Sequence, residues 1–318
     1  MSASRPVRWG FLGAGFVASR GVAPVVHASA TSTLQVVGAR DLARAGALEP
    51  VRSTTSYAEV CSADDVDVVY LSLPNDAHLP WVLTALEAGK HVLCEKPLGL
   101  DAAQVARMTS AARAADRLLV EASWNRWHPR TRRLEQLLGG LDGPVEVDAW
   151  FTFSGVPADN YRLDPARGGG ALYDVGCYAV AAALMALDGK VEVIAAAGTP
   201  SGTGVDLTTT AELRSPVGTA RITASFERDE SQGITVAAPG FALEVPHPAF
   251  TAWREPSSLH VVEHGEPRTE QFESCDPYLL MVDAVSDRVR GGAEWVLPLE
   301  SSLEVARVLD AIREKAAL

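Results

Sequence analysis

Cysteine is scarce in this sequence, and the few cysteines present are far apart. The chain of 318 residues has four of them, Cys61, Cys94, Cys177 and Cys275. They form no Cys-x-x-Cys pair and have no histidine at the spacing of a zinc site. We therefore expect reduced thiols that pack in the fold, and no metal centre.

Long basic blocks and long apolar runs are also missing. The net charge of -12 argues against a nucleic acid or an anionic membrane as the main partner. No stretch has the roughly 20 uninterrupted apolar residues of a membrane span. Residues 1–6 are polar, with no apolar signal-peptide segment behind them. We therefore expect a cytoplasmic protein with no membrane or nucleic-acid partner.

The sequence does contain an apolar segment that enters a glycine-rich turn near its N-terminus. Residues 9–12 are typical of a short buried strand, and the turn 13–15 leads into a helix start whose free N–H groups attract a pyrophosphate. Ala18 occupies the third small position of a dinucleotide-binding motif. Such turns also occur in proteins that bind no nucleotide, so the motif alone leaves both interpretations open. The residues expected around the phosphates are Gly13, Ala14, Gly15, Phe16 and Val17.

Up to residue 121 the sequence alternates between strand-like and helix-like segments. A hydrophobic fraction of 47% over 318 residues supports two domains with substantial cores. The alternation predicts an α/β fold with a doubly wound parallel sheet, so we assign 1–122 to a dinucleotide-binding Rossmann domain. The expected strands are 9–12, 34–39, 66–73, 91–94 and 117–121, and the expected helices are 42–50, 82–88 and 102–115.

From residue 123 onward, apolar and polar residues alternate along the expected strands. A period of two indicates an antiparallel sheet with one covered face, and the uncovered face is often an interface. We expect 123–318 to form an α+β substrate-binding domain on a mainly antiparallel, open-faced sheet. The expected strands are 145–153, 191–197, 208–213, 219–226 and 234–237, and the expected helices are 130–138, 174–187, 278–290 and 301–315.

Unusual residues collect where the expected parallel strands end, which is where such sheets bind ligands. Arg40 follows the glycine turn at a distance of about 20 residues, where NAD-specific folds place an acid against the ribose 2′-hydroxyl. A guanidinium there suits a 2′-phosphate, which favours NADP(H). The neighbouring Asp41 leaves NAD(H) open, and Arg40 could also be a solvated loop charge.

Two further groups have the features of a catalytic site. Lys96, between Glu95 and Pro97, could hydrogen-bond a substrate oxygen, or it could be a surface lysine paired with Glu95. Asp174 and Tyr178 follow three glycines and are four residues apart, so they share one face of the expected helix. A tyrosine facing a lysine can donate the proton that carbonyl reduction requires. Alternatively, Asp174 caps the helix and Tyr178 fills the core.

Taken together, segments 13–18, 73–78, 95–97 and 168–178 resemble a known family of oxidoreductases. It is the family of glucose-fructose oxidoreductase, inositol dehydrogenase and the rhizopine-catabolism proteins, and the resemblance covers nearly the whole chain. It implies a Rossmann domain followed by a mainly antiparallel α/β domain and a nicotinamide cofactor. It also implies homodimers or homotetramers built through the open sheet face.

The resemblance further implies roles for individual residues. Lys96 matches the family's catalytic lysine, and Asp174 matches the aspartate of its Asp-x-Gly-x-His/Tyr segment. Tyr178 matches the closing position, where many inositol-type members have histidine. The tyrosine is similar to that of sugar 3-ketoreductases and dihydrodiol dehydrogenases. Besides Lys96, the residues expected along the cofactor are Leu73, Pro74, Asn75, His78 and Glu95.

Substrate contacts are expected from the second domain. Segment 121–129 looks like the family's domain-crossing segment, so Arg126 and His128 are expected to line the cleft, although His128 could equally be a satisfied linker histidine. Asp174 would position the substrate. Weaker candidates are Tyr161, Arg162 and Arg167, because solvated loop charges explain the arginines nearly as well.

The sequence therefore predicts an NADP(H)-dependent oxidoreductase. The reaction would transfer a hydride between nicotinamide and a secondary alcohol or ketone of a sugar or sugar derivative, including a nucleotide-linked keto sugar. One alternative is an NAD-linked polyol or trans-dihydrodiol dehydrogenase. Another is a non-catalytic dinucleotide-binding sensor of the same fold, against which the retention of Lys96, Asp174 and Tyr178 speaks.

Overall fold

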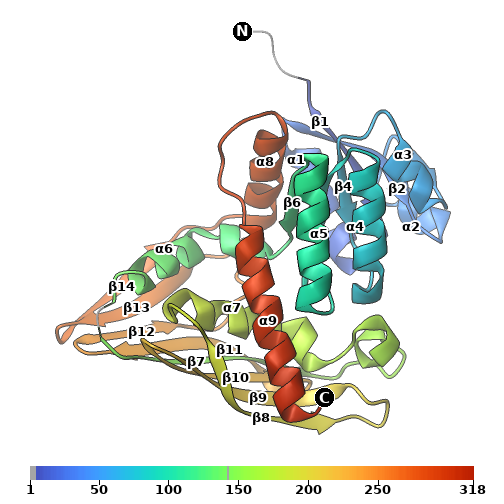
Figure 1. Cartoon of the computed structure of the whole chain (residues 1–318). Coiled ribbons are helices and arrows are strands. Elements are labelled where there is room, and N and C mark those ends of the chain that lie inside the picture. Colours follow the sequence, from blue (N-terminus) through green and yellow to red (C-terminus); the bar gives the residue numbers. More distant parts are fainter. Residues whose placement is uncertain (1–4, 142) are drawn as a thin grey trace. The chain divides into compact units, whose positions relative to one another are not determined.

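The chain folds into two compact units (Figure 1). The computed structural model describes residues 5–141 and 143–318, so residues 1–4, part of the stretch expected to lack a signal peptide, lie outside the described residues. The first unit comprises Met1–Trp124 and Pro277–Leu303, and the second comprises Asn125–Asp276 and Glu304–Leu318. The sequence predicted one boundary between residues 122 and 123, whereas the chain returns to the first unit at Pro277.

The described residues of the first unit form a six-stranded parallel sheet. Its strands are β1 (Val7–Leu12), β2 (Ser32–Gly38), β3 (Arg52–Thr54), β4 (Val68–Leu71), β5 (His91–Cys94) and β6 (Leu119–Glu121). They lie in the order β3-β2-β1-β4-β5-β6, which is that of a Rossmann fold. The predicted doubly wound parallel sheet is therefore confirmed. The sequence missed β3, which is short and largely exposed.

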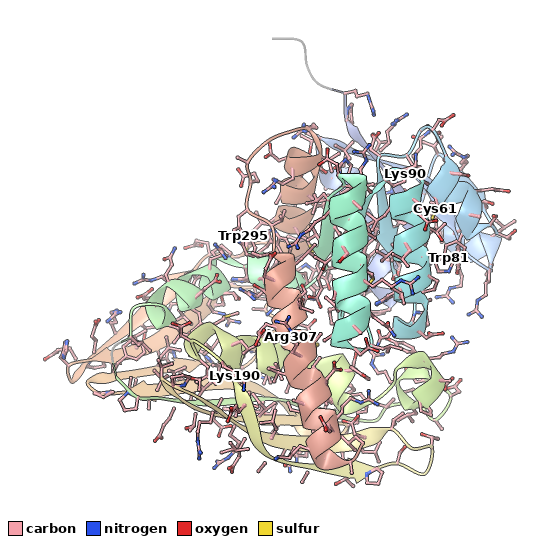
Figure 2. All side chains as sticks on the ribbon, in the orientation of Figure 1. Cys61, Trp81, Lys90, Lys190, Trp295 and Arg307 are labelled. Atoms are coloured by element: carbon pink, nitrogen blue, oxygen red, sulfur yellow. The ribbon has the colours of Figure 1, made fainter. Side chains whose placement is uncertain are left out.

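Helices pack on this sheet in two groups. They are α1 (Ala23–Ala28), α2 (Leu42–Gly46), α3 (Tyr57–Ser62), α4 (His78–Glu87), α5 (Ala102–Ala115) and α8 (Pro277–Val289). Contacts run from α3 to α4 and from α4 to α5, and α1 packs against α8. Figure 2 labels Trp81 of α4. Its ring lies edge to face against Tyr57 of α3, with ring centroids 5.3 Å apart. The carboxylate of Asp101 accepts the Gln104 N–H and so fixes the start of α5.

Specific contacts hold α8 against the N-terminal part of the first unit. Ser29 Oγ donates to Asp283 Oδ1 at 2.6 Å, although the two residues are 254 positions apart. Trp124 stacks on Tyr278 with ring centroids 4.6 Å apart. Contacts at such separation leave no trace in local sequence periodicity, so a single boundary could not describe them.

The second unit is built on an eight-stranded sheet. Its strands are β7 (Val145–Ser154), β8 (Glu192–Pro200), β9 (Asp206–Ser215), β10 (Gly218–Ser225), β11 (Glu227–Ala238), β12 (Phe241–Val245), β13 (Ser257–Glu263) and β14 (Glu266–Phe272). The order is β14-β13-β12-β11-β7-β10-β9-β8. β7 and β10 pair in parallel, and the other neighbours pair antiparallel. The predicted mainly antiparallel sheet is confirmed, although the sequence missed β12, β13 and β14, where charged residues obscure the alternation.

One face of this sheet is covered, and the other is open. Helices α6 (Pro129–Leu138) and α7 (Cys177–Ala186) pack on one face, through contacts of α7 with β7 and β10 and of α6 with β13. The other face carries a hollow of about 990 Å³, lined by side chains that include Asp148, Arg221 and Glu244. The last helix, α9 (Leu299–Ala316), begins in the first unit and ends in the second.

One segment, Pro165–Ala186, is long and apolar enough to pass a length-and-composition test for a membrane-crossing helix. Its most apolar window is 72% buried inside the fold. It ends in α7, whose Ala179 and Val180 are fully buried. This burial is the pattern of a core helix.

Candidate active site

The glycine turn (Gly13, Ala14 and Gly15) lies at the carboxyl end of β1. Gly13 has a φ of 96°, and a Cβ there would lie 2.4 Å from the Ser72 carbonyl oxygen, so only glycine fits. A Cβ at Gly15 would meet only ordinary contacts, the nearest being Ser72 Oγ at 3.5 Å. The protein's own packing therefore does not require glycine at residue 15. An external group that approaches this backbone closely, as a pyrophosphate does, supplies a reason for it.

The turn leads directly into a helix, as a phosphate site requires. Phe16 and Val17 are helical, and the helix continues through a π-helical turn, η1 (Ala18–Val22), into α1. Ala18 is fully buried, as its predicted packing role demands, while Phe16 is 77% exposed. π-Helical turns inside α-helices are frequent at functional sites.

Two arginines follow β2, Arg40 in the loop and Arg44 in α2. Arg40 is exposed. The carboxylate of Asp41 caps α2 by accepting the Ala43 N–H at 2.8 Å and the Arg44 N–H at 3.3 Å, so it is committed to the backbone. Arg44 Nη2 donates to the Ala14 carbonyl at 2.9 Å, which places a second guanidinium against the turn. Sequence analysis missed Arg44, although its spacing of four from Arg40 was the available signal.

His78 ties together two loops that the sequence assigned to the cofactor site. Its Nε2 lies 3.0 Å from the Leu73 carbonyl and its Nδ1 lies 3.0 Å from the Pro97 carbonyl. Burial lowers the pKa of His78, and the neutral ring donates through one nitrogen at a time. The ring is fully buried by protein atoms, so it does not fit the direct cofactor contact expected from the sequence. We place it behind the Leu73-Pro74-Asn75 and Glu95-Lys96-Pro97 loops.

Glu95 is buried beside the candidate catalytic lysine. Tyr70 Oη donates to Glu95 Oε1 at 2.7 Å, and the Lys96 backbone N–H also bonds the Glu95 carboxyl. Burial is the main cause that raises the pKa of Glu95 to about 7, while Tyr70 and the charge of Lys96 act in the opposite direction. Glu95 is 8% exposed, which excludes a solvated surface pair with Lys96. The tyrosine within an otherwise aliphatic strand was the signal that sequence analysis overlooked.

In the second unit, four of the predicted residues come together, and we call them the substrate-side group: Tyr161, Arg162, Asp174 and Tyr178. Arg162 Nε donates to Asp174 Oδ2 at 2.6 Å, and the guanidinium lies 5.2 Å from the centre of the Tyr161 ring. Burial acts to lower the pKa of the Arg162 guanidinium. The interactions with Asp174, Tyr161 and Tyr178 outweigh burial, so the pKa lies above its ordinary value. The pairing shows that Arg162 is not a solvated loop charge.

Two of the three glycines before Asp174, Gly169 and Gly170, are tightly packed. Gly170 has a φ of 120°, and a Cβ there would lie 2.1 Å from Asp206 Oδ1. The Gly170 N–H donates to the Arg162 carbonyl at 2.9 Å, which joins this turn to the arginine. Asp206 Oδ2 in turn accepts the Leu172 N–H at 2.8 Å and so fixes the start of the helix.

Asp174 and Tyr178 lie on one continuous helix that is not α-helical throughout. Asp174 is in a π-helical turn, η6 (Leu172–Gly176), and Tyr178 is in the first turn of α7. The predicted α-helix from 174 therefore begins as a wider turn. The Tyr178 ring lies among Phe151 and Phe250, with ring centroids 5.8 Å and 5.7 Å away, and is 8% exposed.

The other predicted substrate residues have structural partners of their own. Arg126 Nη2 donates to Glu135 at 3.0 Å, and Arg167 pairs with Asp164 at 3.5 Å. His128 caps α6 by accepting the Arg130 N–H on Nδ1 at 3.0 Å. Burial, helped by the charge of Arg130, lowers the pKa of His128 to about 4. These contacts favour the linker interpretation of His128.

Within residues 5–141 and 143–318, no three His, Cys, Asp or Glu side chains are close enough to hold a metal ion. Among the described residues, the structure brings Arg44 to the glycine turn in the first unit and gathers the substrate-side group in the second.

Comparison with known proteins matches both halves of the chain. Residues 7–123 match the model of the oxidoreductase family with an NAD-binding Rossmann fold, and residues 139–238 match the GFO/IDH/MocA C-terminal domain. A D-xylose 1-dehydrogenase (NADP(+)) of Haloferax volcanii is 36% identical over 97% of each chain. Human trans-1,2-dihydrobenzene-1,2-diol dehydrogenase is 31% identical over 97% of this chain and 96% of its own. A crystal structure of a 3-ketoreductase from Actinomadura kijaniata, with NADP and TDP-benzene, superimposes with a TM-score of 0.90 at 28% identity over 98% of each chain.

The contacts of His78 predict that its removal loosens both loops at once. In His78→Ala, peptides covering 71–78 and 93–100 should exchange amide hydrogens about tenfold faster, because the buried ring between the two loops is lost together with the one hydrogen bond it donates, worth about 1 kcal/mol. Hydrogen exchange read by mass spectrometry measures this. His27→Ala is the matched control, since His27 is exposed and its Nε2 lies 2.9 Å from the Leu48 carbonyl, away from both loops. Faster exchange in only one loop would contradict a joint role.

Proposed function

This chain belongs to the GFO/IDH/MocA family of oxidoreductases with an NAD-binding Rossmann fold, and on that premise we propose that it is an NADP(H)-dependent sugar oxidoreductase. The reaction transfers a hydride between nicotinamide and a secondary alcohol or ketone of a sugar or sugar derivative. The observation that supports this function most is the substrate-side group, in which Asp174, Arg162 and Tyr178 lie together. A polar, aromatic group of this kind suits the hydroxyls and apolar ring faces of a sugar.

The proposed roles follow from the chemistry of each side chain. When bound, the nicotinamide supplies or accepts the hydride. The Lys96 ammonium hydrogen-bonds and polarises the reacting oxygen, and Tyr178 Oη gives that oxygen its proton in reduction or takes it in oxidation. Asp174, held by Arg162, accepts hydrogen bonds from substrate hydroxyls. Asn75 and Pro74 border the nicotinamide, and the glycine turn holds the pyrophosphate.

The preference for NADP(H) is supported by the segment after β2, which comprises a short loop and α2. Arg44 supplies a guanidinium group at the turn, and the exposed Arg40 precedes it by four residues. A 2′-phosphate binds such groups through charge-assisted hydrogen bonds. Asp41, which could have favoured NAD(H), already uses its carboxylate to cap α2. The Haloferax relative is named as an NADP(+) enzyme, and the 3-ketoreductase was crystallised with NADP.

The substrate class is narrowed by the arginines of the second unit. A nucleotide-linked sugar needs cations for its phosphates, but Arg126, Arg162 and Arg167 each have a carboxylate partner. We therefore favour a free, uncharged sugar over a nucleotide-linked one. A trans-dihydrodiol is the second candidate, because a relative named for that activity is 31% identical over nearly the whole chain.

We also propose a cytoplasmic location. Cys61, Cys94 and Cys177 are buried, and no disulfide joins the cysteines within the described part of the chain. Unpaired cysteines fit a reducing compartment.

Tyr178 provides the direct test of the reaction. Tyr178→Phe should lower turnover about 10²-fold or more, because the proton donor is lost, and should leave NADPH binding intact. Turnover is measured with D-xylose, other aldoses and keto sugars, and binding is measured by NADPH fluorescence. Tyr57→Phe, on α3, is the control and should retain wild-type turnover. Unchanged turnover in Tyr178→Phe removes Tyr178 from the mechanism, and NADPH binding without turnover on any substrate favours a sensor.

The cofactor assignment is tested by the two arginines. Arg40→Ala and Arg44→Ala should each weaken NADPH binding about 10- to 100-fold, as expected for losing a charge-assisted bond worth about 1.5–3 kcal/mol. NADH binding should change by less than about threefold, since NADH has no 2′-phosphate. Fluorescence titration of both cofactors measures the ratio. A wild-type protein that binds NADH more tightly than NADPH contradicts the assignment.

We further propose that the open face of the second sheet joins two copies of the chain. Its hollow includes Val262, a large apolar side chain that is 39% exposed. Val262→Glu should convert the dimer, or the tetramer built from it, to smaller species, as measured by light scattering after gel filtration. Val51→Glu alters a side chain that is 67% exposed in the first unit and is the control. A monomeric wild-type protein would refute this assembly.

A further inference from the structure

Three side chains form a buried acid cluster in the first unit: Tyr70, Glu95 and Glu121. They are 0%, 8% and 5% exposed. Tyr70 lies in β4, Glu95 directly follows β5 and Glu121 ends β6, and these three strands are neighbours, with Leu71 paired to Cys94 and Cys94 to Glu121. The proposed hydride transfer uses none of these three groups. Two buried carboxylates that influence each other are costly unless donors hold them, so the cluster needs an explanation.

Each carboxylate of the cluster is held by a donor at a fixed position. Glu95 Oε1 accepts the Tyr70 hydroxyl at 2.7 Å, and Glu121 Oε1 accepts the Leu98 N–H at 3.1 Å. The Lys96 N–H also bonds the Glu95 carboxyl. The donors to Glu95 and Glu121 thus include residues on both sides of Pro97, so the cluster is built around the loop that carries Lys96.

The charges that act on Glu95 have opposing signs. The Lys96 ammonium and the Tyr70 hydroxyl favour the ionised carboxylate, and Glu121 disfavours it. Burial first, and then the charges of Glu95 and Glu121, raise the pKa of the Cys94 thiol well above the ordinary value, so this thiol stays protonated. Tyr278 of α8 acts on Tyr70, whose own pKa is raised mainly by burial. Glu95 is therefore a carboxyl on which the Lys96 and Glu121 charges act in opposite directions.

We propose that Glu95, oriented by Tyr70, is a positioning residue for Lys96, and that its ionised carboxylate holds the Lys96 ammonium in the place where it polarises the substrate oxygen. The role in turnover rests on the proposed function, whereas the link between Glu95 and Lys96 does not. Protonation of Glu95 removes the negative charge and releases the ammonium. No other chemical step is involved, because the proton exchanges with solvent.

The pKa of Glu95, raised to about 7 by burial, fixes the direction of the pH dependence. Above this pKa the carboxylate is ionised and Lys96 is held, and as the pH falls through it the hold is lost. Turnover should therefore decline on the acid side near pH 7. Loss of the Tyr70 hydroxyl bond should move this decline to higher pH, and loss of the Glu121 charge should move it to lower pH.

The link can be measured directly because the sequence has four lysines, Lys90, Lys96, Lys190 and Lys315. In protein labelled with 13C at lysine Cε, the Lys96 signal, assigned by its loss in Lys96→Arg, is followed from about pH 5 to about pH 9. We expect an inflection near pH 7 that disappears in Glu95→Gln. It should rise by about one pH unit in Tyr70→Phe and fall by a similar amount in Glu121→Gln.

A packing role for Glu95 gives no reason for the pH of the Lys96 inflection to rise in Tyr70→Phe and to fall in Glu121→Gln. Opposite shifts in the two variants therefore support the positioning role. If one of the two variants fails to fold, the sign found in the other still decides. The acid limb of kcat, measured with NADPH and a reducible sugar, should move as the Lys96 signal does, and kcat in Glu95→Gln should fall about tenfold with KM little changed.

The positioning role of Glu95 and the proposed oxidoreductase function can fail independently of each other. A Lys96 signal without inflection near pH 7 in the wild-type protein overturns the role of Glu95, whether or not sugars are turned over. An inflection with the expected shifts, in a protein that turns over no sugar, upholds the link and refutes the proposed function. An acid limb that stays in place when the Lys96 inflection moves also overturns the positioning role.

Discussion

The parallel pairing of β1 with β2 and β4 is the interaction on which the rest of the first unit depends. It brings the ends of these strands to one edge, so that the Gly13 N–H donates to the Gly38 carbonyl at 2.8 Å and the Ser72 N–H donates to the Leu12 carbonyl at 2.9 Å. Segments that are far apart in the sequence, including Arg40 and Lys96, then share that edge. A parallel sheet collects polar groups at the carboxyl ends of its strands because each strand is buried along its length and only the ends reach a ligand.

In the second unit, close packing of the backbone around Gly170 positions the side chains of the candidate site. Gly170 packs against Asp206 and bonds the Arg162 carbonyl, and this turn brings Arg162 within 2.6 Å of Asp174. The ion pair is half-buried, so its geometry matters more than its contribution to stability. It gives Asp174 a fixed orientation, which a carboxylate needs in order to recognise a pattern of hydroxyl groups.

Sequence reasoning succeeded where the signal was local. The alternation of strand and helix patterns gave the parallel sheet, the period of two gave the antiparallel one, and the predicted bounds of β5 and α5 agree with those of the structure. It failed for β3 and for β12 to β14, whose strands are short or charged. It also missed the return of residues 277–303 to the first unit, because Tyr278 and Asp283 are joined to the rest of that unit only by long-range contacts.

By itself, the sequence determined the kinds of elements, the glycine turn and the family to which the chain belongs, because periodicity and short motifs are written along a single segment. Only the tertiary structure decided which side chains act together. It committed Asp41 to a helix cap, brought Arg44 to the turn, placed His78 behind two loops and buried Glu95 against Tyr70. Such pairings depend on which strands become neighbours and on how much water they exclude, and neither is specified by the residues on either side.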